Sequence, residues 1–119
     1  MRVAIATDQD VVAAQFGGCP MCTIAEVVDG HILDTFIVPN PGCNHEFWAD
    51  LFFRNRVSHV MAGSMGTTAE AVLRGRGINV VLGVRGDVAD AVSRLSRGEL
   101  VSRPGMNRIP GACCSTTSV

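Results

Sequence analysis

The sequence TIAEVVDGHILDTFIV, residues 23–38, predicts a β-hairpin and with it a mixed sheet. Two runs rich in β-branched residues, 23–28 and 32–38, flank the dipeptide Asp29-Gly30, which favours a tight turn between antiparallel strands. Ahead of the hairpin, residues 3–7 are an unbroken apolar run that is typical of a strand buried on both faces. We therefore expect the hairpin to extend a sheet that contains this first strand.

Three helices and two further strands are expected after the hairpin. Asn44 can cap a first helix, the sequence TTAE at 67–70 matches a capping box for a second, and Asp87 can cap a third that ends at Gly98. Short apolar runs at 57–61 and 78–82 predict the strands between them. The order β-β-β-α-β-α-β-α predicts an α/β fold with three layers, ribonuclease H-like, and a five-stranded mixed sheet in which only strand 2 runs antiparallel.

The composition indicates one small cytoplasmic domain. The 119 residues suffice for a single core, which we expect over residues 1–100, followed by a flexible tail over 101–119 that contains two prolines and a Ser/Thr-rich end. A net charge of -1 argues against nucleic-acid binding, and no apolar run approaches the about 20 residues of a membrane span. Five cysteines, an odd number, without an export signal indicate reduced thiols in the cytoplasm.

Three glycine-containing loops are expected at one edge of the sheet. They follow the first strand and the strands of the two βα units, and they cover residues 7–22, 63–67 and 83–87. Ligands of open α/β sheets bind beyond the carboxyl ends of parallel strands, and two of these loops lead into helix N-termini, which favour anions. Neither loop is a Walker A or a GxGxxG motif, and each glycine alone is an ordinary turn residue. Together the loops predict a shared anion pocket.

Sulfur ligands are expected beside the same pocket. The sequence CPMC at 19–22 is a C-x-x-C motif, and pairing across the hairpin places Cys22 roughly opposite Ile37, near Cys43 and His45. A closed zinc site is disfavoured because three of the four ligands lie on glycine-rich connections. A redox dithiol is disfavoured because a strand, rather than a helix that would lower a thiol pKa, follows the motif. The candidate metal ligands are Cys19, Cys22, Cys43 and His45.

Five motifs in combination resemble the dinitrogenase iron–molybdenum cofactor biosynthesis family, which comprises the NifX and NifB-C-terminal-like proteins. They are VAIATD at 3–8, FGGCP at 16–20, VPNPG at 38–42, AGSMG at 62–66 and GVRGDV at 83–88. The resemblance covers about residues 1–100 and implies a ribonuclease H-like fold. It also implies a non-enzymatic carrier of an anionic metal–sulfur cluster or its precursor, with Mo and Fe, or Mo and Cu as in the orange-protein branch. Donor and acceptor proteins for the cluster would be its partners.

Two positions depart from the pattern of the family. Many relatives have His where this chain has Gln15, and an aromatic pair where it has Met21-Cys22. The second difference creates the C-x-x-C motif, so both thiolate ligation and non-covalent binding of a cluster remain open.

The resemblance gives roles to the residues of the pocket. Backbone N–H groups of the loops 63–67 and 83–87 would donate to sulfides, Arg85 would offset the charge of the cluster, and Phe16, Met21 and Met65 would form an apolar wall. The candidate binding residues are Gln15, Phe16, Gly17, Gly18, Cys19, Met21, Gly63, Ser64, Met65, Gly66, Thr67, Arg85 and Gly86.

Two other functions remain open at this point. A Mg²⁺-dependent phosphoryl-transfer enzyme or nuclease of ribonuclease H-like fold would need several convergent carboxylates, and this edge offers Asp8, Asp10 and Asp87. A regulatory domain that binds a small anion or nucleotide would use the same glycine loops. The sequence does not indicate an oligomeric state.

Overall fold

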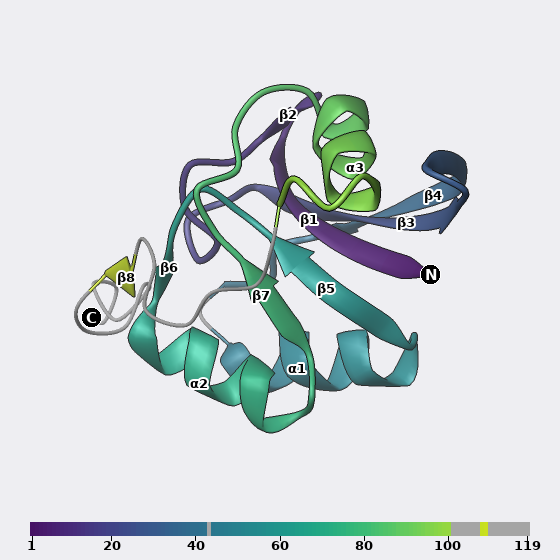
Figure 1. Ribbon diagram of the computed structural model, residues 1–119. Coiled ribbons are helices and arrows are strands. Elements are labelled where there is room, and N and C mark those ends of the chain that lie inside the picture. The colour runs from purple at the N-terminus through teal and green to yellow at the C-terminus, as the bar shows by residue number, and fades with distance from the viewer. Residues whose placement is uncertain (43, 101–107, 110–119) are drawn as a thin grey trace.

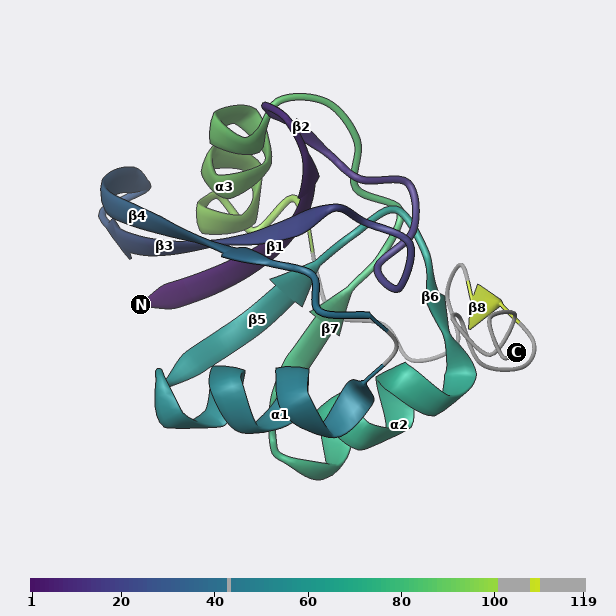
Figure 2. The ribbon, with the colours of Figure 1, turned by 180° about the vertical axis from the view of Figure 1, so that it is seen from behind.

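The protein is an α/β domain with a mixed sheet between two helical layers (Figures 1 and 2). The structure, a computed structural model, describes residues 1–42, 44–100 and 108–109. Helices α1 (His45–Arg54) and α2 (Thr67–Gly75) cover one face of the sheet, and α3 (Val88–Ser96) covers the other. The strands are β1 (Arg2–Asp8), β2 (Val11–Val12), β3 (Met21–Val28), β4 (His31–Pro39), β5 (Val57–Met61), β6 (Met65–Gly66), β7 (Asn79–Val81) and β8 (Arg108–Ile109).

The main sheet has the strand order β4-β3-β1-β5-β7, with β2 paired to the end of β1. Strand β3 runs antiparallel to β1 and β4, whereas β5 and β7 continue the sheet in parallel with β1. The mixed α/β architecture agrees with the expectation from the sequence. The expected count of five strands is wrong, because Val11–Val12 folds back on Thr7 and Asp8 as a sixth strand that is also antiparallel.

The hairpin predicted at residues 23–38 is present. Asp29 and Gly30 form its two-residue turn with positive φ angles of 52° and 80°, which suits the twist of the flanking strands. The register shifts by one residue between Glu26 and Val27. Cys22 therefore pairs with Val38 rather than with Ile37, the partner expected from uninterrupted pairing.

The three helix starts differ in how they are capped. The side chain of Asn44 accepts a hydrogen bond from the Phe47 N–H at 2.9 Å, so the expected cap of α1 is present. Asp87 occupies the N-cap position of α3, but its side chain makes no capping hydrogen bond. Gly98, with φ 81°, follows the end of α3 as expected.

The capping box predicted for α2 is wrong. The N-cap residue is Gly66, which has no side chain with which to cap the helix. Glu70 is 1% exposed and lies 2.8 Å from the Nε of Arg74, one turn further along the helix. This buried ion pair removes the carboxylate from the helix start, so among the described residues the N–H groups of the first turn of α2 receive no side-chain cap.

Apolar side chains fill both faces of the sheet, so β1 is buried on both sides as expected. On the α1 and α2 face, the Phe16 ring meets Trp48 edge-on at 5.9 Å between centroids, and Trp48 stacks on Phe52 at 5.5 Å. On the α3 face, Ala91 and Val92 pack in the second cluster. Phe16 belongs to the loop after β1, so its contact with Trp48 of α1 connects the core to the candidate site.

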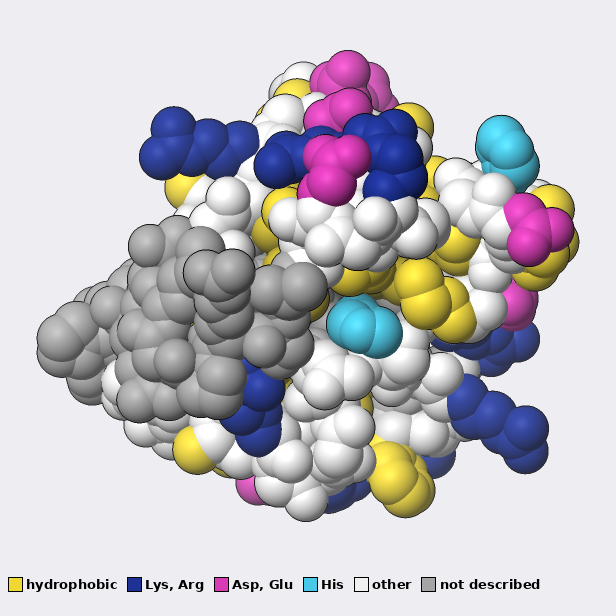
Figure 3. Space-filling view, viewed as in Figure 1, with side chains coloured by type: hydrophobic (Ala, Val, Ile, Leu, Met, Phe, Trp, Pro, Cys, Tyr) yellow, Lys and Arg dark blue, Asp and Glu magenta, His cyan; other side chains and the backbone are white. Residues whose placement is uncertain are grey.

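The outer surface of α3 is polar. Side chains of both charges lie interleaved over this helix in Figure 3. Arg97 lies 2.7 Å and Arg94 3.8 Å from the Glu99 carboxylate. Such a mixed, exposed arrangement is typical of a solvated helix face.

The expected tail, residues 101–119, lies mostly outside the described residues, as do Cys113 and Cys114. Two of its residues, Arg108–Ile109, form β8, which pairs in parallel with Met65–Gly66 of β6. The domain boundary near residue 100 stays a prediction. In the part of the chain that the structure describes, every helix is too short or too polar to cross a membrane.

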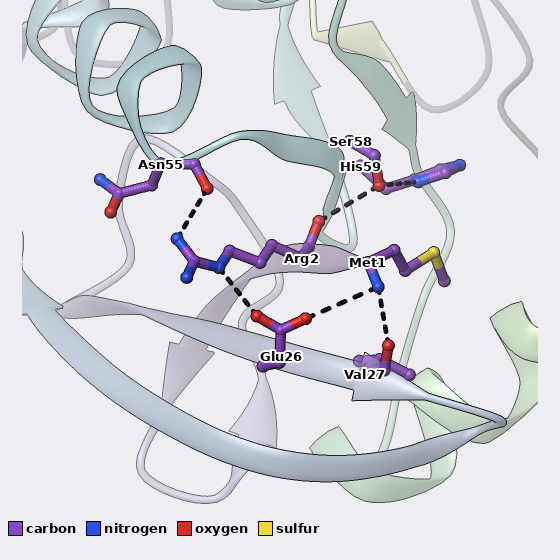
Figure 4. A network of polar contacts seen from close by, with 7 residues as sticks. All are labelled: Met1, Arg2, Glu26, Val27, Asn55, Ser58 and His59. Atoms are coloured by element: carbon purple, nitrogen blue, oxygen red, sulfur yellow. Dashed lines mark hydrogen bonds and ion pairs between the residues drawn. The ribbon is translucent and has the colours of Figure 1, made fainter.

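A polar network holds the end of the sheet at which β1 begins (Figure 4). The N-terminal ammonium group donates to the Val27 carbonyl at 2.7 Å and lies 3.7 Å from the Glu26 carboxylate. The guanidinium of Arg2 donates to Glu26 at 3.0 Å and to the Asn55 carbonyl at 3.1 Å. The hydrogen bond from Arg2 lowers the pKa of Glu26. The network connects β1 with β3 and with the end of α1.

His59 lies beside this network and predicts a pH dependence of stability. Its Nδ1 is 2.8 Å from Ser58 Oγ, and burial lowers the pKa of His59 below its usual 6.5. The unfolded chain therefore binds the proton more readily. The stability contributed by the neutral ring is present above about pH 6.5 and is lost as the pH falls through the lowered pKa of the folded state.

We expect His59→Gln to reduce the loss of thermal midpoint between about pH 7 and pH 5, as measured by calorimetry. His31→Gln, at an exposed position next to the hairpin turn, is the matched control and should leave this loss unchanged. Equal pH profiles for His59→Gln and the unchanged protein would contradict the assignment.

Candidate functional site

The loop that follows β1 lies against the loop that follows β5, and main-chain hydrogen bonds join them. The Gly63 N–H donates to the Ala13 carbonyl at 3.0 Å, and the Phe16 N–H donates to the Ser64 carbonyl at 2.9 Å. The hydroxyl of Ser64 donates to the Ala14 carbonyl at 2.8 Å. These bonds fix residues 13–16 as a strand-like segment beside the β5 loop.

The loop that follows β7 joins the same assembly. The Val12 N–H donates to the Gly86 carbonyl at 2.8 Å, and the Gly83 N–H donates to the Gly63 carbonyl at 2.8 Å. The three loops predicted to meet at one edge of the sheet, residues 7–22, 63–67 and 83–87, therefore do so. We call this assembly the three-loop edge.

Gly63 allows the closest contact within the three-loop edge. A Cβ atom at this position would lie 2.6 Å from the carbonyl oxygen of Ala14, a distance that Cβ atoms do not tolerate. The two backbones can therefore approach and exchange their hydrogen bonds only if residue 63 lacks a side chain. This requirement gives one of the predicted glycines a structural reason beyond turn formation.

Several N–H groups that we expected to face an anion are used within the fold. Besides Gly63 and Gly83, the Val88 N–H at the start of α3 donates to the Asp10 carbonyl at 3.3 Å. The loop 83–87 thus has fewer donors to offer than predicted. The first turn of α2, which no side chain of the described residues caps, is more favourable for negative charge than the loop 83–87, because of its N–H groups and the helix dipole.

Two residues expected in the apolar wall of the pocket lie in the core instead. Phe16 is 1% exposed and packs on Trp48, and Met65 is fully buried in the same cluster. Each of the two residues directly follows a member of the bridge between Gln15 and Ser64, and successive side chains of a strand point to opposite sides. Both side chains support the edge from below, and only Met21 of the expected wall is partly exposed.

The other predicted residues lie at or near the surface of the three-loop edge, except Cys19 and Gly66, which are buried. Arg85 is exposed, and no ion pair of the described residues involves it. The guanidinium group of Arg85 is therefore exposed and unpaired among the described residues. Partly or fully exposed members of the set are Gln15, Gly17, Gly18, Gly63, Ser64, Thr67, Arg85 and Gly86.

Both cysteines of the C-x-x-C motif are buried in the core below the edge. Cys19 is 3% exposed and Cys22 is fully buried. The Cys19 thiol donates to the Phe16 carbonyl oxygen at 2.7 Å. The bond from Cys22 lowers the pKa of Cys19, whereas the same contact and burial raise the pKa of Cys22. A strand follows the motif as expected, so neighbouring donors rather than a helix dipole favour the Cys19 thiolate.

The other two candidate metal ligands do not complete a site in the described structure. Cys43 lies outside the described residues, and His45 is the first residue of α1. Among the described residues, no three His, Cys, Asp or Glu side chains are grouped so as to hold a metal ion. This holds equally for a zinc-type set and for the carboxylates Asp8, Asp10 and Asp87.

Asn40 positions the cysteine loop, a role that the sequence analysis missed. Its side-chain amide donates to the carbonyls of Gly17 at 3.2 Å and Cys19 at 2.7 Å. Its backbone N–H donates to the Pro20 carbonyl at 3.0 Å, and its Oδ1 accepts from Gly42 at 2.9 Å. The only signal in the sequence is a polar residue between two prolines in the VPNPG motif.

A comparison with known families decides what kind of protein carries this edge. Residues 1–98 match the family model described as dinitrogenase iron-molybdenum cofactor. The chain belongs to this family. The match confirms the resemblance inferred from the five motifs and associates the chain in general terms with metal–sulfur cluster chemistry. A search of curated protein sequences found no significant match.

Solved structures share the fold. A candidate dinitrogenase from Methanococcus jannaschii has a TM-score of 0.74 and 21% identity, covering 88% of this chain and 94% of its own. The apo form of the orange protein from Desulfovibrio gigas has a TM-score of 0.74 and 20% identity, covering 87% and 93%. A candidate NifB protein from Thermotoga has a TM-score of 0.66 and 23% identity, covering 87% and 98%. At these sequence identities, the similarity shows that the fold is shared and shows nothing about function.

The contact at Gly63 makes a prediction with a matched control. Gly63→Ala should lower the free energy of unfolding by about 1–3 kcal/mol, because the new methyl group separates two hydrogen-bonded loops. Gly75→Ala, within α2 and with nothing within 4 Å of the added Cβ, should raise it by up to about 1 kcal/mol. Urea denaturation measures both changes. Equal stabilities for the two variants would contradict the close approach.

Proposed function

We propose that the protein is a non-enzymatic carrier of an anionic metal–sulfur cluster, or of a precursor, that contains Mo with Fe or Cu. It would receive this cargo from a donor protein and pass it to an acceptor protein. The observation that carries the proposal is the uncapped start of α2 at the three-loop edge, in a chain of this family. The strand order supports assigning the fold to the ribonuclease H-like class, and the reduced cysteines support a cytoplasmic location.

The cluster would bind over the first turn of α2. Sulfides on its surface would accept hydrogen bonds from the backbone N–H groups of Thr67 and Thr68, which are partly and fully exposed in that turn. Donors aimed at an ionised group contribute about 1.5–3 kcal/mol each, more than bonds between neutral groups. Because the interlocked backbone already holds these donors, binding would require little reorganisation.

Exposed residues of the neighbouring loops would border the cluster. The positive charge of Arg85 would compensate the negative charge of the cluster. Close approach of the cluster to the backbone would be permitted at Gln15 and at the glycines Gly17, Gly18 and Gly86. Met21 would contribute a polarizable side chain. A cluster saturated with inorganic sulfide needs no protein thiolate. Direct ligation by Cys19, Cys22, Cys43 or His45 is therefore the secondary mode of this proposal.

The regulatory alternative shares the strongest feature of the site, since an uncapped helix start also suits a phosphate. The two can be separated with tetrathiomolybdate, an anionic molybdenum sulfide, and with inorganic phosphate and ATP as competitors. We expect neither competitor to displace tetrathiomolybdate at equal concentration. The nuclease alternative lacks support from the described residues, because two-metal catalysis needs several convergent carboxylates.

Charge reversal at the edge tests the proposal. Arg85→Glu should weaken the binding of tetrathiomolybdate at least about tenfold, because it replaces an attraction with a repulsion. Arg56→Glu is the matched control, since this exposed arginine lines a hollow with Met1 and Arg54 at the opposite end of the sheet, and it should change binding little. Anaerobic titration followed by absorption spectroscopy measures both affinities.

The binding mode gives a second comparison in the same titration. Replacing Cys19, Cys22 and Cys43 together by Ser should weaken binding less than Arg85→Glu does. If the triple variant binds no metal while Arg85→Glu binds normally, thiolates are obligatory ligands and the proposed mode is wrong.

A further inference from the structure

Arg56 has a backbone conformation that is unfavourable for a residue with a side chain. Its φ angle is 59°, in the left-handed region that favours glycine. Arg56 follows Asn55, the C-cap of α1, whereas the corresponding positions after α2 and α3 are Gly77 and Gly98, with φ angles of 78° and 81°. Helix termination alone would favour glycine at position 56, so it does not account for an arginine there.

The charges of Arg54 and Arg56 are not compensated within the part of the chain that the structure describes. Both side chains are exposed, and no ion pair of the described residues includes either of them. Arg54 donates to the main-chain carbonyl of Asp50 at 3.4 Å. The neighbouring Arg76, by contrast, lies 2.6 Å from the Asp50 carboxylate. The end of α1 therefore presents two positive charges that the described fold does not use.

These charges border a hollow of about 570 Å³ between the end of α1 and the turn that joins α2 to β7. Arg54, Arg56 and Arg76 line this hollow, and none of the described residues that line it is acidic. Dark blue side chains project at the lower right of Figure 3, near the turn between α1 and β5. We call this surface the arginine hollow. Its charge favours a ligand with negative groups.

An exposed aromatic ring gives the arginine hollow an apolar part. Phe53 lines the hollow and is 59% exposed. The guanidinium carbon of Arg76 lies 5.8 Å from the centroid of the Phe53 ring, and the ion pair of Arg76 with Asp50 holds this guanidinium in place. The ring is therefore positioned before any partner arrives. Arginine and phenylalanine are enriched in protein–protein interfaces, where rigid aromatic side chains act as anchors.

We propose that the arginine hollow binds an acidic segment of a partner protein. An apolar side chain of that segment would pack on Phe53, and its carboxylates would accept hydrogen bonds from Arg54 and Arg56, since a guanidinium matches a carboxylate in geometry. A nucleic acid fits less well, because Glu46 and Asp50 beside Arg76 would repel a long polyanion and the chain has a net charge of -1.

The arginine hollow lies at the opposite end of the sheet from the three-loop edge. It includes Val57 and Ser58 at the start of β5, whereas the loop after the end of β5 belongs to the three-loop edge. A partner bound here would leave the three-loop edge open. The inference therefore does not rest on the proposed function. The two can fail separately, because Arg85→Glu acts on tetrathiomolybdate binding and changes at Arg56 act on the partner.

The test measures the binding of short, fluorescently labelled peptides to the full-length protein by fluorescence anisotropy. The peptides combine Asp or Glu with Leu, Val or Phe, and matched peptides carry Asn or Gln in place of the acids. We expect the acidic peptides to bind and the amide peptides to bind at least about tenfold more weakly, because charge-assisted hydrogen bonds are lost. Failure of all the acidic peptides to bind, or equal binding of an oligothymidylate, would overturn the proposal.

Arg56→Gly separates a binding role from a structural one. It should raise the thermal midpoint, because glycine relieves the left-handed backbone, and it should weaken acidic-peptide binding about tenfold. Phe53→Ala should also weaken binding. Arg97→Gln, at an exposed position after α3, is the matched control and should bind normally. Unchanged peptide affinity of Arg56→Gly, or a lowered midpoint together with weaker binding, would overturn the proposal.

Discussion

The close approach of Gly63 to Ala14 is the constraint on which the candidate site depends. It lets the loop after β1 exchange main-chain hydrogen bonds with the loop after β5, and Gly63 in turn accepts a bond from Gly83 of the third loop. Each bond is worth only about 1 kcal/mol, but together they convert three separate connections into one surface. The start of α2 is held within that surface, so its N–H groups need no side-chain cap for their orientation.

The same loop separates two kinds of chemistry. Its outer side, with Gln15 and the glycines, borders a helix start that favours anions, and its inner side directs Phe16 and Cys19 into the core. Asn40 connects this loop to the end of β4 and so to the sheet. The backbone of the loop therefore separates the surface beside the helix start from the apolar core.

Local patterns predicted much of the fold, and long-range contacts account for what they missed. The Asp29-Gly30 turn and the Asn44 cap depend on neighbouring residues alone, and the convergence of the loops follows from the rule that parallel strands end at one edge. The buried pair of Glu70 with Arg74 overrides a local capping box, and a bulge shifts the register at Cys22. The burial of Cys19 likewise depends on how the loop turns inward, which spacing alone does not reveal.

The most direct test of the account is a map of the amide groups that respond to an anionic molybdenum sulfide. Heteronuclear NMR of the unchanged protein, titrated anaerobically with tetrathiomolybdate, reports on every backbone N–H. The account predicts the largest shifts at residues 64–68 and at Arg85, with little change at Arg2 and Asn55 at the opposite end of the sheet. Shifts centred on Arg2 and Asn55, with residues 64–68 unchanged, would contradict it.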